Sequence, residues 1–100
     1  MNASRIDVVA IDATGPLRFA VTVFEDSGES RYETTLRETE LVRLGDGASA
    51  EAFVAAAFRF LLDREPRQAI LAKFDIAVIA HYFPEFDMQI GRYLARGAAG

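Results

Sequence analysis

The sequence of 100 residues is the size of one domain, and 51% of it is hydrophobic, with eight Phe, three Tyr and no Trp. The absence of Cys excludes disulfide scaffolds, thiolate metal sites and thiol catalysis. The formal net charge is −4, with acids and bases interspersed, and this disfavours a nucleic-acid partner because that affinity comes largely from neutralising phosphates.

Apolar segments in the sequence are too short to cross a membrane, and Arg59 and Asp63 interrupt the longest of them. Residues 1–12 also lack the basic segment and long apolar run of a secretory signal. Together with the absence of Cys, these features lead us to expect a cytoplasmic protein with no membrane contact.

Three strands are predicted in the strand-rich half, residues 1–37. Residues 5–12 are almost continuously apolar, which predicts a central strand covered on both faces, at least at its C-terminal end. Residues 13–16 then carry a turn signal. Apolar and polar side chains alternate clearly through residues 17–25 and again through residues 31–37, as expected for two strands with one buried face.

A hairpin turning at Ser27–Gly28 is predicted to join the second and third strands. This register pairs the buried positions across the two strands: Val23 with Tyr32, Val21 with Thr34, and Phe19 with Leu36. Because all of these side chains then lie on one face, turn position and side-chain period agree.

The helical half, residues 38–96, begins with two helices whose caps are readable. Thr39 is expected to cap a short helix that Gly45 ends. Ser49 is expected to cap the main helix, which runs to about Arg64 because Pro66 disfavours helical conformation at the residue before it.

Three shorter helices are predicted to follow. Pro66 begins one that reaches about Lys73, and Asp75 caps the next. Pro84 begins the last, which ends before a flexible tail at residues 97–100. We therefore predict a single α+β domain over residues 1–100, in which a small antiparallel sheet of about three strands is followed by one long and several short helices packed on it.

His81 is the only histidine, so imidazole acid–base or metal chemistry would have to use it. Glu85 follows at a spacing that suits two ligands on one helix, but Pro84 breaks the helix between them. One His and one Glu are also too few ligands for a metal site. We therefore predict no metal or cofactor and find no catalytic constellation. His81 with Tyr82, Glu85 or Asp75 stays open as an enzyme hypothesis that requires these groups to meet in a cleft.

Other short motifs have simpler explanations. Residues 12–15 differ from the Asp-Thr-Gly loop of aspartic proteases by the inserted Ala13, and one Gly cannot form a phosphate cradle. Ser49 lacks the context of a catalytic serine. Glu85 and Asp87 complement the dipole of the last helix rather than forming a catalytic pair.

A helix-turn-helix interpretation of the helical half fails on its contacts, because Ala77, Ala80 and His81 would offer the recognition surface few donors. Nucleic-acid binding then depends on whether folding gathers the five remaining candidates, which are Arg64, Arg67, Lys73, Arg92 and Arg96.

The segment between Phe74 and Tyr93 has more large apolar side chains than a short helix pair easily buries. Such an excess favours self-association or a protein partner. The candidate interaction surface comprises Tyr82, Phe83, Phe86, Met88 and Tyr93.

The segment from Glu65 to Glu85 carries the pattern Glu-Pro … Ile-Leu … Phe-Asp … Ile … Tyr-Phe-Pro-Glu. On this pattern the chain resembles a group of small bacterial proteins of uncharacterised function, which share a strand-rich N-terminal part and a helix ending at Glu-Pro. The similarity covers the second half well and the hairpin loosely. The resemblance implies a bacterial source and brings no activity or catalytic residues.

Taken together, the sequence predicts a small cytoplasmic interaction or regulatory protein, a homodimer that acts through contacts of its helical half. The alternative is an accessory or antitoxin-like subunit of a larger complex. In that case the hairpin edge Arg31–Arg37 or the C-terminal aromatic residues would dock the partner.

Overall fold

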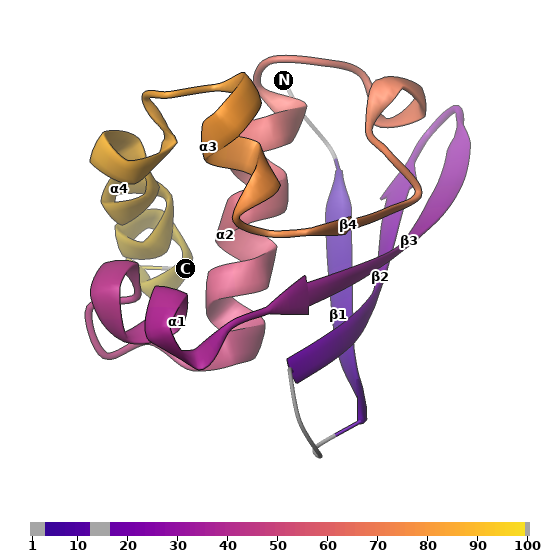
Figure 1. The fold of residues 1–100 in the computed structure, drawn as a ribbon. Helices are drawn as coiled ribbons and strands as arrows, with labels where there is room; N and C mark the ends of the chain where they lie inside the picture. The colour runs from indigo at the N-terminus through magenta and orange to yellow at the C-terminus, as the bar shows by residue number, and fades with distance from the viewer. Residues whose placement is uncertain (1–3, 13–16, 100) are drawn as a thin grey trace.

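A four-stranded mixed sheet and the helices that follow it form an α+β fold, confirming the predicted class (Figure 1). The computed structural model describes residues 4–12 and 17–99. The elements in chain order are β1 (Arg5–Asp12), β2 (Leu17–Glu25), β3 (Gly28–Leu36), α1 (Glu38–Leu44), α2 (Ala50–Leu62), the 3-10 helix η1 (Arg67–Ala69), β4 (Lys73–Asp75), α3 (Val78–Tyr82) and α4 (Phe86–Ala99).

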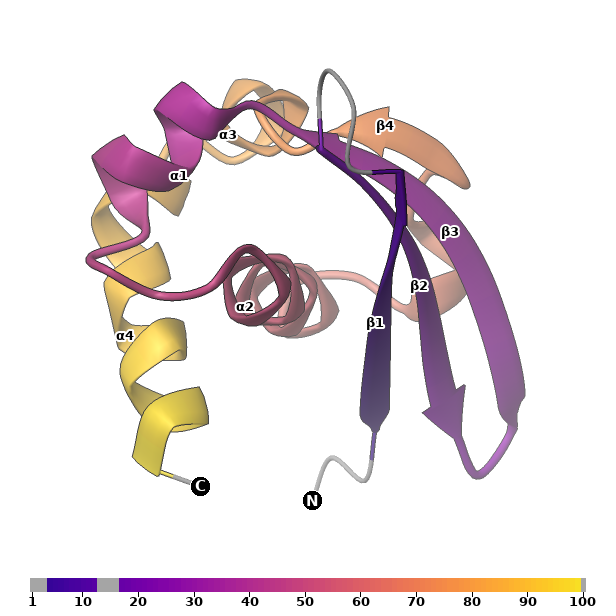
Figure 2. The same ribbon diagram turned by 90° about the horizontal axis from the view of Figure 1, so that it is seen from below.

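The sheet has the order β1-β2-β3-β4. The first three strands are antiparallel, as predicted, whereas β4 runs parallel to β3 after the long connection through α1 and α2. Figure 2 shows α2 end-on between the inner face of the sheet and α4, while none of the helices in the described residues covers the outer face. The turn predicted at residues 13–16 lies outside the described residues.

β1 is an edge strand, so the prediction that it is central and covered on both faces is wrong. Ile6 and Val8 pack against the core, whereas Val9 and Ile11 lie on the outer face with 62% and 48% of their surface exposed. The continuous apolar run therefore reflects an uncovered apolar strip on the outer face and not a second covered face.

The β2–β3 hairpin turns at Asp26–Ser27, so the predicted register is wrong by two residues. The observed register gives four inward-facing cross-strand pairs: Val23 with Ser30, Val21 with Tyr32, Phe19 with Thr34, and Leu17 with Leu36. A shift of two preserves the face of every side chain, so the predicted inner face is still correct. Gly28 takes the last turn position with φ of 139°, a conformation that glycine adopts readily.

The predicted helix boundaries are partly confirmed. The Ser49 hydroxyl accepts a hydrogen bond from the Ala52 amide at 3.1 Å, which confirms the cap of α2. Gly45 ends α1 as predicted, but the helix begins after Arg37, and Thr39 lies inside it rather than capping it.

The segment after Pro66 differs from its prediction as a helix reaching Lys73. Only the 3-10 turn η1 forms there, and the chain then extends into β4, where the Ile76 amide also donates to the Thr35 carbonyl. Asp75 accepts from the Ala77 amide just before α3. Helix α4 continues to Ala99, so the predicted tail from residue 97 is helical to that point.

α2 forms the centre of the core and uses two aromatic residues on opposite sides. Phe58 meets Tyr32 of the sheet, with ring centroids 5.1 Å apart. Phe60 meets Phe86 and Tyr93 of α4 at 5.0 and 5.7 Å, in edge-to-face geometry. One apolar helix therefore packs against the sheet on one side and against α4 on the other.

Candidate functional site

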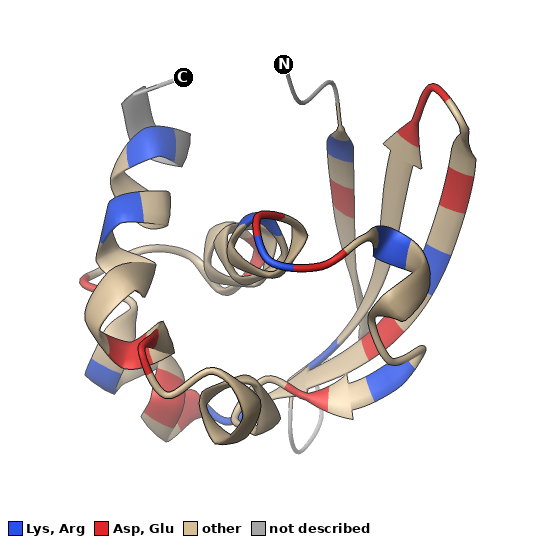
Figure 3. Ribbon diagram, turned by 90° about the horizontal axis from the view of Figure 1, so that it is seen from above, with Lys and Arg blue, Asp and Glu red and all other residues tan. Residues whose placement is uncertain are grey.

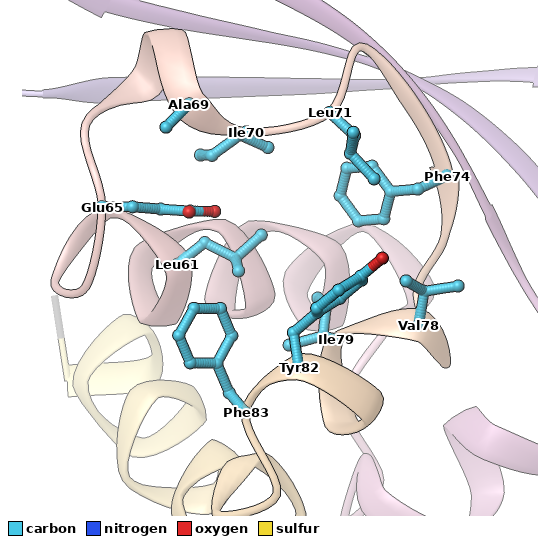
Figure 4. A pocket seen from close by; sticks show the side chains of 10 residues that line it. All are labelled: Leu61, Glu65, Ala69, Ile70, Leu71, Phe74, Val78, Ile79, Tyr82 and Phe83. Carbon is cyan, nitrogen blue, oxygen red and sulfur yellow. The ribbon is translucent and has the colours of Figure 1, made fainter.

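A pocket of about 280 Å³ opens between the end of α2, the η1–β4 segment and α3 (Figure 4). We call it the α2–α3 pocket. The side chains that line it come from these three segments and are Leu61, Glu65, Ala69, Ile70, Leu71, Phe74, Val78, Ile79, Tyr82 and Phe83.

The floor and rim of the α2–α3 pocket differ in exposure. Leu61, Ile70 and Ile79 are buried core residues and form a rigid floor. Leu71 and Tyr82 stand at the rim with 55% and 64% of their surface exposed. An apolar floor with exposed apolar residues beside it is typical of a binding pocket rather than of a packing defect.

One wall of the pocket is fixed by Arg67, which is only 7% exposed. Its guanidinium forms an ion pair with Glu25 at 2.9 Å and donates to the hydroxyls of Ser30 at 2.6 Å and Ser27 at 3.2 Å. The Tyr32 hydroxyl donates to the Arg67 carbonyl, and burial raises the pKa of that hydroxyl. We call this network the hairpin clamp, because it holds η1 against the tip of the β2–β3 hairpin.

The end of α2 is held by Arg64, whose side chain lies over the ring of Phe60 with the guanidinium carbon 3.6 Å from the centroid. The guanidinium forms an ion pair with Glu85 at 3.0 Å and donates to Gln89 at 2.6 Å. These bonds join α2 to the start of α4, so both ends of the segment 64–67 are anchored.

Glu65 lies between these two anchored arginines and points into the α2–α3 pocket, between Leu61 and Ile70 (Figure 4). It is half-buried, and no hydrogen bond or ion pair joins its carboxylate to another described residue. Arg64 and Arg67 are already bound to Glu85 and Glu25. The pocket is therefore apolar except for one carboxylate without a cationic partner and the Tyr82 hydroxyl.

The predicted interaction surface divides into exposed and buried residues. Phe86 and Tyr93 belong to the core, so they do not contribute to an exposed surface in this fold. Tyr82 and Phe83 line the α2–α3 pocket, and Met88 lies on α4 with 85% of its surface exposed. The aromatic residues at the end of α3 thus line a pocket, whereas those of α4 pack in the core.

His81 and Glu85, the weak polar candidates, are not brought together. His81 is exposed and contacts the ring of Tyr82, with no hydrogen bond or ion pair to another described residue. A hydrogen bond to its own backbone amide and the ion pair with Arg64 hold the pKa of Glu85 below its ordinary value. Asp75 is bonded to Thr35 and to the Ala77 amide. The cleft that the enzyme hypothesis requires is absent around His81 in the described part of the chain.

The basic residues that nucleic-acid binding would need are dispersed. Arg64 and Arg67 point inward, as described above, and Lys73 pairs with Glu33 at 3.5 Å. Arg92 and Arg96 lie on α4, which is separated from β4 by α2 (Figure 2). Acidic and basic residues are both spread over the sheet and the helices (Figure 3).

The described residues contain neither a metal-binding cluster nor a membrane-spanning helix. No group of three or more His, Asp or Glu side chains in residues 4–12 and 17–99 could hold a metal ion. Over the same ranges, every helix is too short or too polar to span a bilayer.

Comparisons with protein-family models, with curated proteins and with solved structures return no match. The resemblance to a group of small bacterial proteins therefore stays a prediction from the sequence. The sequence did not predict the α2–α3 pocket, and the candidate interaction surface included only Tyr82 and Phe83 of its ten lining residues.

Proposed function

We propose that this chain is a protein-interaction module whose α2–α3 pocket receives one side chain of a partner protein. The observation that carries the proposal is the continuity between the buried floor of the pocket and the exposed side chains of Leu71 and Tyr82. Interfaces concentrate their affinity in such central apolar pockets, and the exposed rim excludes water around them.

The size of the pocket favours a side chain over a large cofactor. Ligand-binding clefts usually measure about 300 to 1,000 Å³, and this one, at about 280 Å³, lies just below that range. A bulky side chain with its neighbours on the rim fills such a volume. This supports an interaction or regulatory role with the helical half as the contact surface, whereas the bacterial source and cytoplasmic location stay predictions from the sequence.

A peptide selection with a blocked pocket tests the proposal. Random peptides displayed on phage are selected on the wild-type chain and counter-selected on Ala69→Trp, which fills the pocket from η1 without removing a core side chain. We expect peptides that bind the wild type and the control Val42→Trp, at an exposed position on α1, but lose at least about tenfold in affinity for Ala69→Trp. Recovery of no peptide with this dependence would contradict the proposal.

We also propose that the homodimer predicted from the sequence forms through β1 rather than through the helical half. β1 is a long edge strand with exposed Val9 and Ile11, whereas the opposite edge is closed by the short β4. Docking at Arg31–Arg37, the alternative from the sequence, is less favoured because β4 already occupies the edge of β3 at Glu33–Thr35.

Sedimentation velocity at micromolar concentration tests the dimer. We expect the wild type and the control Val42→Lys to sediment as dimers, and Val9→Lys to sediment as a monomer, because a lysine on an edge strand opposes strand pairing. A monomeric wild type, or a Val9→Lys variant that stays dimeric, would overturn this assignment while leaving the pocket proposal intact.

A further inference from the structure

The carboxylate of Glu65 defines the chemistry of the pocket's occupant. The residue is half-buried, and its side chain points into the pocket between Leu61 and Ile70 (Figure 4). A charge in such a position is unfavourable unless a counter-charge or hydrogen-bond donors satisfy it. No described residue supplies either.

The neighbouring cations are unavailable to Glu65 because each has another acid. Arg64 is bound to Glu85 at 3.0 Å and Arg67 to Glu25 at 2.9 Å, and both guanidinium groups are also hydrogen-bonded to neutral side chains. Lys73 pairs with Glu33 on the outer face of the sheet. The missing cation must therefore come from outside the described chain.

Aromatic rings complete this complementarity. Phe74, Tyr82 and Phe83 all line the pocket that Glu65 enters. Aromatic faces attract ammonium and guanidinium groups, and aliphatic stems of basic side chains pack well on apolar surface. A basic side chain would thus place its stem against the apolar floor and its charged end at the carboxylate.

We propose that the α2–α3 pocket selects a lysine or arginine side chain of the partner, with Glu65 as the residue that determines this specificity. The inference rests on the proposed function and adds the charge of the occupant to it. A neutral apolar side chain would leave the carboxylate buried without a partner, and an acidic one would add repulsion.

Three aliphatic probes of similar length and different charge test the inference: n-pentylammonium, 1-pentanol and hexanoate. Each is titrated into the wild-type chain at pH 7 and low salt, and the backbone amide shifts of Ala69, Ile70 and Tyr82 are followed by NMR. We expect n-pentylammonium to bind about fivefold or more tightly than 1-pentanol, the difference expected for hydrogen bonds to a charged group, and hexanoate to bind most weakly.

Glu65→Gln is the decisive variant, because it keeps the shape of the side chain and removes its charge. We expect the preference for n-pentylammonium to disappear in this variant and to shrink in the wild type as salt is raised. Equal affinities for the three probes, a preference that survives in Glu65→Gln, or an absence of shifts at these amides would each overturn the inference.

The probe titration and the peptide selection separate the two proposals. Peptides that depend on the pocket but show no lysine or arginine, together with probes that show no charge preference, would remove the role of Glu65 and leave the interaction module standing. Peptides that fail to depend on the pocket would remove the interaction module itself.

Discussion

The hairpin clamp and the α2–α3 pocket lie side by side at the end of α2, but they differ in whether their charged side chain has a partner. In the clamp, buried Arg67 is satisfied by Glu25, Ser27 and Ser30. In the pocket, half-buried Glu65 has no partner among the described residues. Arg67 thus belongs to a network that is complete within the chain, whereas Glu65 lies in the pocket that we propose a partner side chain completes.

Loss of the clamp is the largest effect we expect. Arg67→Met removes the guanidinium and leaves Glu25 without its partner, which should lower the free energy of unfolding by about 3 to 5 kcal/mol. Equilibrium urea denaturation measures this loss. Arg67→Lys keeps the charge but not the forked donors, so its free energy of unfolding should lie between those of the wild type and Arg67→Met. A loss below about 1 kcal/mol in Arg67→Met would show that the clamp does not stabilise the fold.

Loss of the second anchor should have a smaller effect. Arg64→Met removes the bonds to Glu85 and Gln89 and the contact with the Phe60 ring. Because Glu85 is more exposed than the acid in the hairpin clamp, we expect a loss of about 2 kcal/mol in the same urea experiment. A larger loss than in Arg67→Met would reverse the order of the two anchors.

Acid should weaken the ion pair between Arg64 and Glu85, whereas the apolar contacts of the pocket floor do not depend on pH. The pKa of Glu85 is held below its ordinary value of 4.5 in the folded chain, chiefly by its own backbone amide and then by Arg64. A lowered carboxyl pKa stabilises the fold above the unfolded value, and this stability is lost as the pH falls below about 4.5.

The pH dependence is tested by repeating urea denaturation at pH 7, 4.5 and 3. We expect Glu85→Gln to lose less stability on acidification than the wild type, whereas Glu38→Gln, an exposed substitution on α1, should follow the wild type. Identical pH profiles for Glu85→Gln and the wild type would show that this ion pair does not contribute to the acid response.

The contrast between clamp and pocket explains which parts of the structure the sequence predicts. The Ser49 cap and the inner face of the β2–β3 hairpin depend on residues a few positions apart, and both are confirmed. β4 is too short for a side-chain period to reveal it, so the sequence predicts that Lys73 ends one helix and that Asp75 caps the next.

The pocket could not be predicted because its distinguishing feature depends on distant partners. Arg64 binds an acid 21 residues away and Arg67 binds one 42 residues away. Only when both pairs are known is it evident that Glu65, the acid between them, is bound to neither arginine. The one available sequence signal is an acid set between two arginines and followed by Pro66, which predicts a helix end and nothing about pairing.

The unfolding free energy of Glu65→Gln tests the difference between clamp and pocket most directly. If Glu65 serves binding and not folding, neutralising it should leave the free energy of unfolding within about 0.5 kcal/mol of the wild type, or raise it, because no native ion pair is lost. A decrease of about 2 kcal/mol or more in urea denaturation would show that Glu65 is a structural residue like Arg67, and would contradict its assignment to binding.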